Sequence, residues 1–105
     1  MSYCRFGEAD VYVFTASWGI DCCGCILQER EWVDDPNRPV LKGYFKAVGE
    51  IIPTYFKSNT GMIEHLERHV AAGHHVPEYV FELLRDPADA AENEAIWREY
   101  EAKSA

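Results

Sequence analysis

Two short pairs of potential metal ligands constrain the fold of this chain more than any other feature. Cys22 and Cys25 are three residues apart, and Gly24 between them suits a tight turn that directs two thiolates at one ion. His65 and His69 are four residues apart, so on a helix both imidazoles project from the same face. If the two pairs meet in space, they supply a closed set of four ligands of the kind that binds structural zinc.

The residues before the histidine pair are also regularly spaced. Five residues separate Phe56 from Met62, and two residues separate Met62 from His65. This arrangement resembles the helical half of a Cys2His2 zinc finger, and the cysteine pair resembles the other half. The resemblance implies a ββα element in which the two cysteines and two histidines bind one zinc ion. A usual finger has about a dozen residues between its halves, whereas 39 intervene here, so the sequence predicts a finger with a long insertion.

Each pair also has a simpler interpretation. A His-x3-His pair on a helix can consist of two solvated or hydrogen-bonded histidines, and a Cys-x2-Cys pair can be a redox pair or two buried thiols. Cys23 could replace Cys22 in a Cys-x-Cys arrangement. Cys4 is expected to be a small buried thiol, and it becomes a candidate ligand if the insertion keeps one histidine away from the ion. The presence of both halves in one short chain favours zinc binding by Cys22, Cys25, His65 and His69.

A further histidine pair, His74 and His75, invites comparison with the paired histidines of small metal-dependent nucleases. Those sites also need an asparagine and another histidine on a downstream helix, but His75 is the last histidine of the chain. The sequence favours a helix C-terminus at this point, where a partly protonated histidine interacts favourably with the helix dipole and caps carbonyl groups.

The N-terminal third of the chain favours a β-hairpin. Residues 10–16 are β-branched and aromatic, and both faces of this strand are partly apolar, so we expect it to be covered on both sides. Residues 17–21 form the turn region, and residues 26–33 alternate well enough for a second, antiparallel strand. The Cys-Cys-Gly-Cys segment would then lie at the turn of the hairpin or at the entrance of its second strand.

The insertion is predicted to begin with a loop at residues 34–39, which are rich in proline, asparagine and aspartate. Residues 54–56 could add a short strand beside the hairpin. Between these segments, five apolar residues at helical spacing predict a short helix within residues 40–53, although two glycines weaken it. The five residues are Leu41, Tyr44, Phe45, Val48 and Ile52.

Three helices are predicted in the C-terminal half. The first begins with Asn59 or Thr60 as N-cap and runs to about residue 72, where Gly73 suits the position after its end. The second covers residues 78–85 after Pro77, and the third runs from residue 86 to about residue 100. The residues expected to face the core are Met62, Leu66 and Val70 in the first helix, Tyr79, Val80, Leu83 and Leu84 in the second, and Ile96, Trp97 and Tyr100 in the third.

The length of 105 residues suggests a single domain with a modest core, which a bound metal would stabilise. We divide this domain into a hairpin with its cysteine knuckle (1–33), the insertion (34–55), the helical half with the histidines (56–85) and an acidic C-terminal helix (86–105). No apolar run approaches the roughly 20 residues that cross a bilayer, and the N-terminus lacks the features of a signal peptide. We therefore expect a cytoplasmic protein, in which four reduced cysteines favour a metal site over disulfides.

Four segments of the sequence carry a resemblance to one group of proteins. They are the opening Met-Ser-Tyr-Cys-Arg-Phe, the following Asp-Val-Tyr-Val, the Cys-Cys-Gly-Cys knuckle, and the pattern His-Leu-x2-His-x3-Gly-His-x-Val-Pro over residues 65–77. Together they resemble small uncharacterised proteins of actinobacteriophages and their hosts, over most of residues 1–85. The resemblance implies a small accessory protein that works in a bacterial cytoplasm, and it implies no particular activity.

Charge and motifs limit the classes of function. Eighteen acidic against ten basic side chains give a formal charge of −8, and phosphate backbones repel such a chain. The helix positions that would face DNA bases are Ser58, Gly61 and Glu64, none of which reads purines with two hydrogen bonds. A closed ligand set leaves no position for a catalytic water, and the sequence contains no phosphate loop, nucleophile elbow or His-Glu-x2-His motif.

We therefore expect a small zinc-stabilised accessory protein, of phage origin, that binds a host or phage protein and is not an enzyme. Two alternatives remain open on the sequence. One is a zinc-finger-type regulator that binds nucleic acid. The other is a metal-free α+β interaction domain whose cysteines and histidines are incidental.

Overall fold

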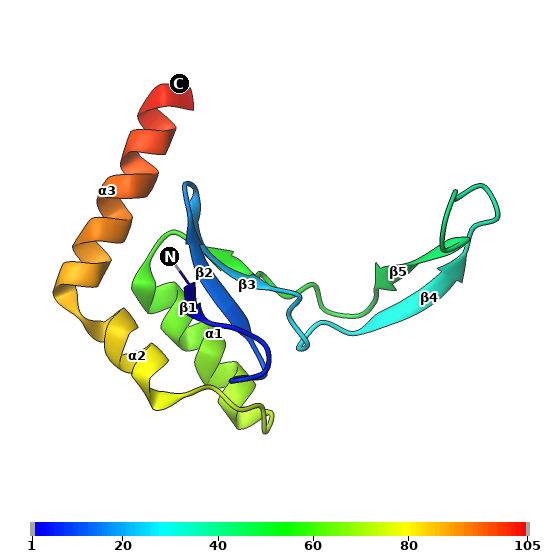
Figure 1. The fold of residues 1–105 in the computed structure, drawn as a ribbon, viewed down its shortest axis with the longest axis horizontal. Helices are drawn as coiled ribbons and strands as arrows, with labels where there is room; N and C mark the ends of the chain where they lie inside the picture. Colours follow the sequence, from blue (N-terminus) through cyan, green and yellow to red (C-terminus); the bar gives the residue numbers. More distant parts are fainter. Residues whose placement is uncertain (1, 105) are drawn as a thin grey trace.

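The structure, a computed structural model that describes residues 2–104, combines antiparallel strands in the N-terminal half with three C-terminal helices (Figure 1). This confirms the predicted α+β class. The strands are β1 (Ser2–Cys4), β2 (Tyr12–Ala16), β3 (Gly19–Cys23), β4 (Arg30–Asp34), β5 (Gly43–Ala47) and β6 (Tyr55–Phe56). The helices are α1 (Asn59–Ala71), α2 (Glu78–Arg85) and α3 (Pro87–Ser104).

The main sheet has four antiparallel strands in the order β1-β2-β3-β6. A short turn joins β2 to β3, so that Ala16 pairs with Gly19 and Tyr12 with Cys23. A side chain at Gly19 would place its Cβ 2.6 Å from the carbonyl oxygen of Phe56. Glycine at this position therefore lets β6 pair with β3, and the predicted short strand at residues 54–56 is found there.

The expected second strand at residues 26–33 does not pair with β2, and this part of the prediction is wrong. The partner of β2 is β3, which ends with Cys22 and Cys23. The cysteine knuckle therefore lies at the end of the second strand of the hairpin and not at its turn. Gly24, with φ of +61°, turns the chain away from the sheet immediately after β3. The alternation correctly indicated a strand only for residues 30–33, which lie in β4, because residues 26–28 form a turn and a bend. Alternation also does not identify the strand with which a segment pairs.

The short helix predicted within residues 40–53 is also wrong, because residues 43–47 form β5 and pair with β4. Trp32 lies opposite Phe45 in this ladder, with their ring centroids 5.2 Å apart. A Cβ at Gly43 would lie 2.4 Å from the Trp32 ring, so glycine is needed to seat the indole. The apolar residues fit a helical period, but the cross-strand aromatic pair and the absence of a side chain at Gly43 favour the hairpin.

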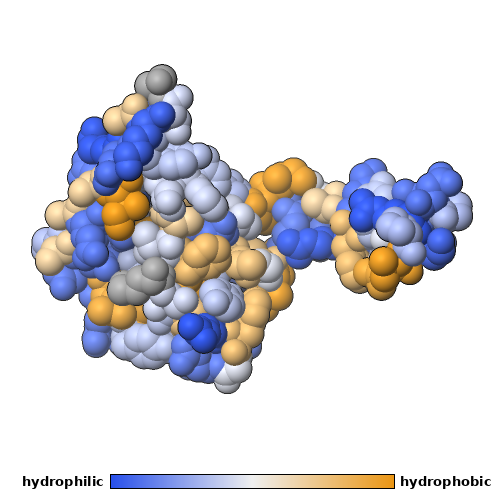
Figure 2. All heavy atoms as spheres, turned by 45° about the horizontal axis from the view of Figure 1, so that its top comes forward, coloured by the Kyte–Doolittle hydropathy of each residue, from blue (hydrophilic) through white to orange (hydrophobic). Residues whose placement is uncertain are grey.

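The β4–β5 hairpin and the loop at its tip, residues 30–47, project from the rest of the molecule and are called the arm here (Figures 1 and 2). The buried side chain of Gln28 fastens the base of the arm. Its Nε2 donates to the carbonyl groups of Val48 and Glu50, at 3.2 and 3.1 Å, and its Oε1 accepts from the Ile52 amide at 2.8 Å. The two chains that lead into and out of the arm are therefore held side by side.

The core lies between one face of the main sheet and the helices. Val11 and Val13 are buried on this face, whereas Tyr12 and Phe14 are only half-buried on the other. We expected the strand to be covered on both faces, but the second face carries a row of edge-to-face contacts from Phe6 through Tyr12 to Phe14. The largest fully buried apolar side chains are Val11, Val13, Ile20, Met62, Leu66, Val80 and Leu84.

Helix α1 begins one residue earlier than expected, because Ser58 is the N-cap and its Oγ accepts from the Gly61 amide at 3.1 Å. Asn59, one of the two predicted caps, is instead buried and bonded to other elements. Gly73, with φ of +88°, lies just beyond the end of α1, as predicted. Val70 was assigned to the core but is half exposed, and His69 occupies the buried face in its place.

In α2 the buried residues again differ in part from those predicted. Val80 and Leu84 are buried as predicted, but Tyr79 and Leu83 are exposed, and Phe81 is buried instead. Within residues 2–104, no helix combines the length and the apolar character needed to cross a membrane.

Helix α3 packs through a polar residue, and the apolar anchors that we expected play a smaller part. Asn93 is the buried residue of this helix, whereas Trp97 is half-buried and Ile96 and Tyr100 are 36% and 44% exposed. The Asn93 Nδ2 lies 2.8 Å from the Tyr3 hydroxyl and 2.9 Å from the Asn59 Oδ1. This network joins β1, α1 and α3.

Candidate metal centre

Four buried side chains from two distant parts of the chain meet between the end of β3 and helix α1. They are Cys22, Cys25, His65 and His69, the four ligands proposed from the sequence, and their donor atoms all lie within 4.8 Å of one another. Within residues 2–104 this is the one group of three or more such side chains arranged to hold an ion. The structure thus brings together both halves of the pattern despite the long insertion.

Local structure places the cysteines. Cys22 lies in β3, opposite Val13, and its amide donates to the Thr54 carbonyl at 2.7 Å. The left-handed turn at Gly24 then brings Cys25 back beside Cys22. The carbonyl of Cys25 accepts from the Arg30 Nη1 at 3.1 Å, which fixes the knuckle to the start of the arm. Both thiols therefore occupy rigid positions.

Helix α1 places the histidines. One helical turn separates them, and their ring centroids are 4.9 Å apart. The ring of Phe56 lies against His65, with centroids 5.3 Å apart. A Cβ at Gly61 would lie 3.0 to 3.3 Å from Phe56, so glycine makes room for this aromatic ring. The aromatic residue predicted from the finger spacing thus packs directly on a candidate ligand.

The donor atoms fit a tetrahedral ion. The Cys22 Sγ lies 3.7 Å from the His69 Nε2, and the Cys25 Sγ lies 3.5 and 3.3 Å from the Nε2 atoms of His65 and His69. The two Nε2 atoms are 3.3 Å apart. Zinc–sulfur and zinc–nitrogen bonds of about 2.3 and 2.0 Å, arranged as a tetrahedron, require separations of about 3.3 to 3.8 Å. These four separations match a tetrahedral zinc ion, and all four donor atoms lie within 4.8 Å of one another.

Burial determines the charge at this site. It raises the pKa of the Cys22 thiol, and the neighbouring Cys25 raises it further. Burial also lowers the pKa of His65, and that of His69 to about 4, with His65 and His74 adding to the shift of His69. The imidazoles are thus neutral, as metal binding requires. A divalent ion that deprotonates two thiols leaves the buried cluster with no net charge, which avoids the cost of burying an unpaired charge.

The other candidate residues lie outside this set. Cys23 is exposed and Cys4 is buried, where its Sγ donates to the Val11 carbonyl at 3.5 Å. His75 is exposed. His74 is not a ligand, but its Nδ1 lies 2.9 Å from the Nδ1 of His69. His74 was expected only as part of a helix C-terminus, and its contact with His69 was not predicted.

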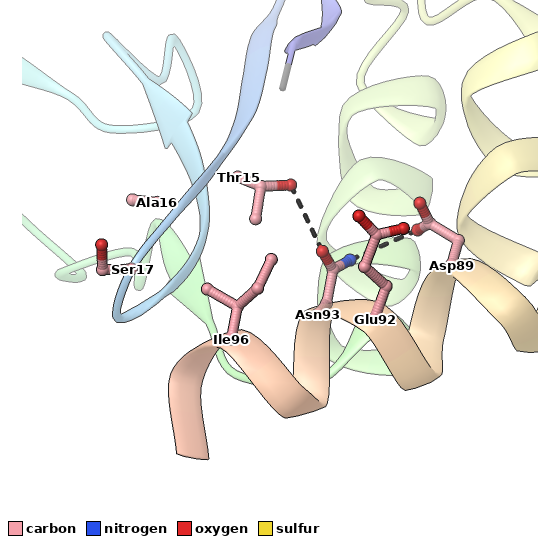
Figure 3. Close-up of a pocket in the computed structure, with 7 residues that line it drawn as sticks. All are labelled: Thr15, Ala16, Ser17, Asp89, Glu92, Asn93 and Ile96. Carbon is pink, nitrogen blue, oxygen red and sulfur yellow. Dashed lines mark hydrogen bonds between the residues drawn. The ribbon is translucent and has the colours of Figure 1, made fainter. Parts of the chain in front are cut away.

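A cavity of about 240 Å³ lies between the β2–β3 turn and α3 (Figure 3). Asn93 points into it, and its amide group is already bonded: the Oδ1 accepts from the Thr15 Oγ1 at 3.4 Å, and the Nδ2 donates to the Asp89 Oδ2 at 3.3 Å. The hydrogen bond between Asn93 and Thr15 therefore helps to hold α3 on the sheet.

The resemblance to a zinc finger concerns the ligand types, the spacing within each pair and the aromatic contact to His65. The connection between the pairs differs, because the chain between them forms the arm and the strand β6. No protein-family model, no curated protein and no solved structure matches the chain.

Proposed function

We propose that this chain is a zinc-stabilised protein-binding module without catalytic activity. The observation that carries the proposal is the set of four buried donors, all within 4.8 Å of one another, of which four pairs lie at the 3.3 to 3.7 Å that a tetrahedral ion requires. Two sulfurs and two nitrogens in this geometry suit zinc better than the hard cations, which prefer oxygen ligands. A set of four protein ligands completes the tetrahedron, so the ion would have a structural role.

The ion would join the end of the main sheet and the root of the arm to helix α1. Cys22 and Cys25 lie where the chain leaves the main sheet, and Arg30 at the root of the arm bonds to the Cys25 carbonyl. His65 and His69 lie on the helix that covers the core. Zinc would therefore fix the root of the arm relative to the body, and its binding free energy would become folding free energy.

The arm is the surface that we propose for partner binding. An isolated two-stranded hairpin is at best marginally stable in water, yet this arm exposes much of its apolar surface (Figure 2). Phe45 is 67% exposed, and Val40 and Leu41 at the tip are 81% and 71% exposed. A partner that covers these side chains would stabilise the arm, and the burial of their apolar surface would contribute to the binding free energy.

Charge indicates the chemistry of that partner. Although the whole chain carries −8, the arm contains four basic and three acidic side chains, and the acidic ones all precede the stretch 36–47, which contains three basic side chains. These are Arg38, Lys42 and Lys46, and they flank the exposed apolar residues of the tip. We propose a partner protein with an apolar recess bordered by carboxylates, because such a surface complements both features.

The resemblance of the sequence to proteins of actinobacteriophages and their hosts is the sole basis for the cellular setting. On that basis we propose an accessory protein of phage origin that acts in the host cytoplasm on a host or phage protein.

The experiment that tests partner binding compares capture by the wild-type chain with capture by a Phe45→Ser variant. Proteins retained by the wild type and lost in the variant would be purified and titrated against both chains. Direct binding that weakens at least tenfold in the variant supports the proposal. Equal binding by both chains would contradict a role for the arm. Binding of single- or double-stranded nucleic acid at low salt, lost in the same variant, would replace the protein partner with a nucleic acid.

A further inference from the structure

We propose that His74 positions the metal ligand His69 by accepting a hydrogen bond from the ring nitrogen that faces away from the ion. This role rests on the proposed zinc site. It assigns a third histidine to the centre as a positioning residue, in addition to the two histidine ligands.

The geometry determines which nitrogen of His69 faces the ion and which one faces His74. Its Nε2 lies 3.3 to 3.7 Å from both sulfurs and from the Nε2 of His65, so Nε2 is the atom directed at the ion. Its Nδ1 lies 2.9 Å from the Nδ1 of His74. A neutral imidazole that binds metal through one nitrogen carries its proton on the other. His69 therefore donates from Nδ1, and the Nδ1 of His74 accepts.

The end of helix α1 holds His74 in place for this contact. The His74 amide donates to the His69 carbonyl at 2.9 Å, and the Gly73 amide donates to the Val70 carbonyl at 3.0 Å. These two bonds form a Schellman motif, which requires the left-handed conformation that Gly73 adopts. The same motif that ends the helix thus directs the side chain of His74 back to His69.

The residue that follows is fixed as well. Asp10 donates from its amide to the His75 carbonyl at 2.9 Å, and its carboxylate accepts from the His75 amide. The segment that carries His74 is thereby attached both to α1 and to the chain that leads into β2. A partner nitrogen held this way fixes the tautomer and the ring orientation of His69 and makes its Nε2 a better ligand.

Two substitutions at one position separate hydrogen bonding from packing. In His74→Asn the side-chain oxygen takes the place of the imidazole Nδ1 and can accept the same bond, whereas His74→Leu puts a methyl group there. Zinc affinity would be measured by competition with a chromophoric chelator. We expect His74→Leu to weaken zinc binding by about 10- to 100-fold, and His74→Asn to restore most of the loss. His75→Leu, which alters an exposed side chain, is the control and should bind zinc as the wild type does.

The tautomer of His69 gives a second test that needs no variant. In a 1H–15N correlation spectrum of the zinc-loaded wild type, the proton of His69 should reside on Nδ1. A proton on Nε2 would overturn the assignment. It would also be overturned if His74→Leu bound zinc as tightly as the wild type, or if His74→Asn lost as much affinity as His74→Leu. A wild-type chain that bound no zinc would overturn the proposed metal site and this role together, whereas tight zinc binding unaffected by His74→Leu would overturn the role of His74 alone.

Discussion

The Sγ of Cys25 lies 3.3 Å from the Nε2 of His69, although 44 positions separate the two residues in the sequence. This contact closes a loop that contains the whole arm, and it connects the end of the main sheet to the helix that covers the core. Closing a long loop is costly in conformational entropy. A bound ion at this contact would offset that cost, so we expect the metal centre to contribute strongly to stability.

The first prediction concerns pH. Burial lowers the pKa of His69 to about 4, from an ordinary value of 6.5. The unfolded chain therefore takes up a proton at a higher pH than the folded chain does, and the free energy of unfolding should fall as the pH decreases from about 6.5 towards 4. Protons also compete with zinc for thiolates and imidazoles, so the zinc-loaded protein should show the steeper decrease.

Urea unfolding at a series of pH values, with and without chelator, measures this dependence. His75→Gln is a suitable control because its side chain is exposed, and it should leave the pH profile unchanged. A free energy of unfolding that stayed constant between pH 7 and pH 4.5 would show that His69 is not buried as a neutral imidazole.

The polar network at α3 yields a second prediction. Asn93→Leu removes the donor to the Tyr3 hydroxyl and to the Asn59 Oδ1. Tyr3 keeps its hydrogen bond to the Asp89 carboxylate, but the buried Asn59 Oδ1 is left without its partner. We expect a loss of about 2 kcal/mol or more in the free energy of unfolding. Glu94→Gln in the same helix removes only an exposed ion pair with Arg98 and should change stability by less than about 0.5 kcal/mol. Equal effects of the two substitutions in chemical denaturation would contradict the network.

A third prediction uses two glycines with positive φ. Gly19→Ala places a Cβ 2.6 Å from the Phe56 carbonyl oxygen, whereas Gly7→Ala meets no atom within 4 Å. Both changes strain the backbone, at about 1 to 2 kcal/mol each. Gly19→Ala should cost clearly more because it also separates β6 from β3. Thermal melts of the two variants would decide this, and a smaller effect at Gly19 would argue against the pairing of these strands.

The arm gives a fourth prediction. Phe45→Ser alters a side chain that is 67% exposed and packs against Trp32 within the arm. Zinc content should be unchanged, and the melting temperature should change by only a few degrees. Partner binding, in contrast, should weaken strongly. A Phe45→Ser chain that lost its zinc would show that the arm and the metal centre are not independent.

The metal centre could be predicted from the sequence because its residues follow local spacing rules. A Cys-x2-Cys turn and a His-x3-His helical pair each bring two donors to one side, whatever the rest of the fold does. The ends of α2 and the turn at Gly73 were predictable for the same reason, since proline and glycine act locally. These features depend on neighbours within about five positions.

The pairing of β2 with β3 and the formation of the arm by β4 and β5 could not be predicted, because they depend on contacts that local patterns do not encode. The alternation of residues 26–33 indicated a strand but not its partner, and the helical spacing within residues 40–53 arose by coincidence in β5. The buried position of Asn93 follows from partners in β1 and α1, which no local pattern encodes. To predict the contact between His74 and His69, one would have to know that the helix ends at Gly73 and that His69 binds the ion through Nε2, which leaves its Nδ1 for His74.

The most direct test of this account is the metal content of protein purified without a histidine tag, for the wild type and for Cys25→Ser, His69→Ala and Cys23→Ser. We predict one zinc ion per wild-type chain and per Cys23→Ser chain, since Cys23 is exposed and lies outside the cluster. Cys25→Ser and His69→Ala should lose both the zinc and much of the thermal stability. A wild-type chain without zinc, with ligand variants that melt at the same temperature as the wild type, would contradict the central claim.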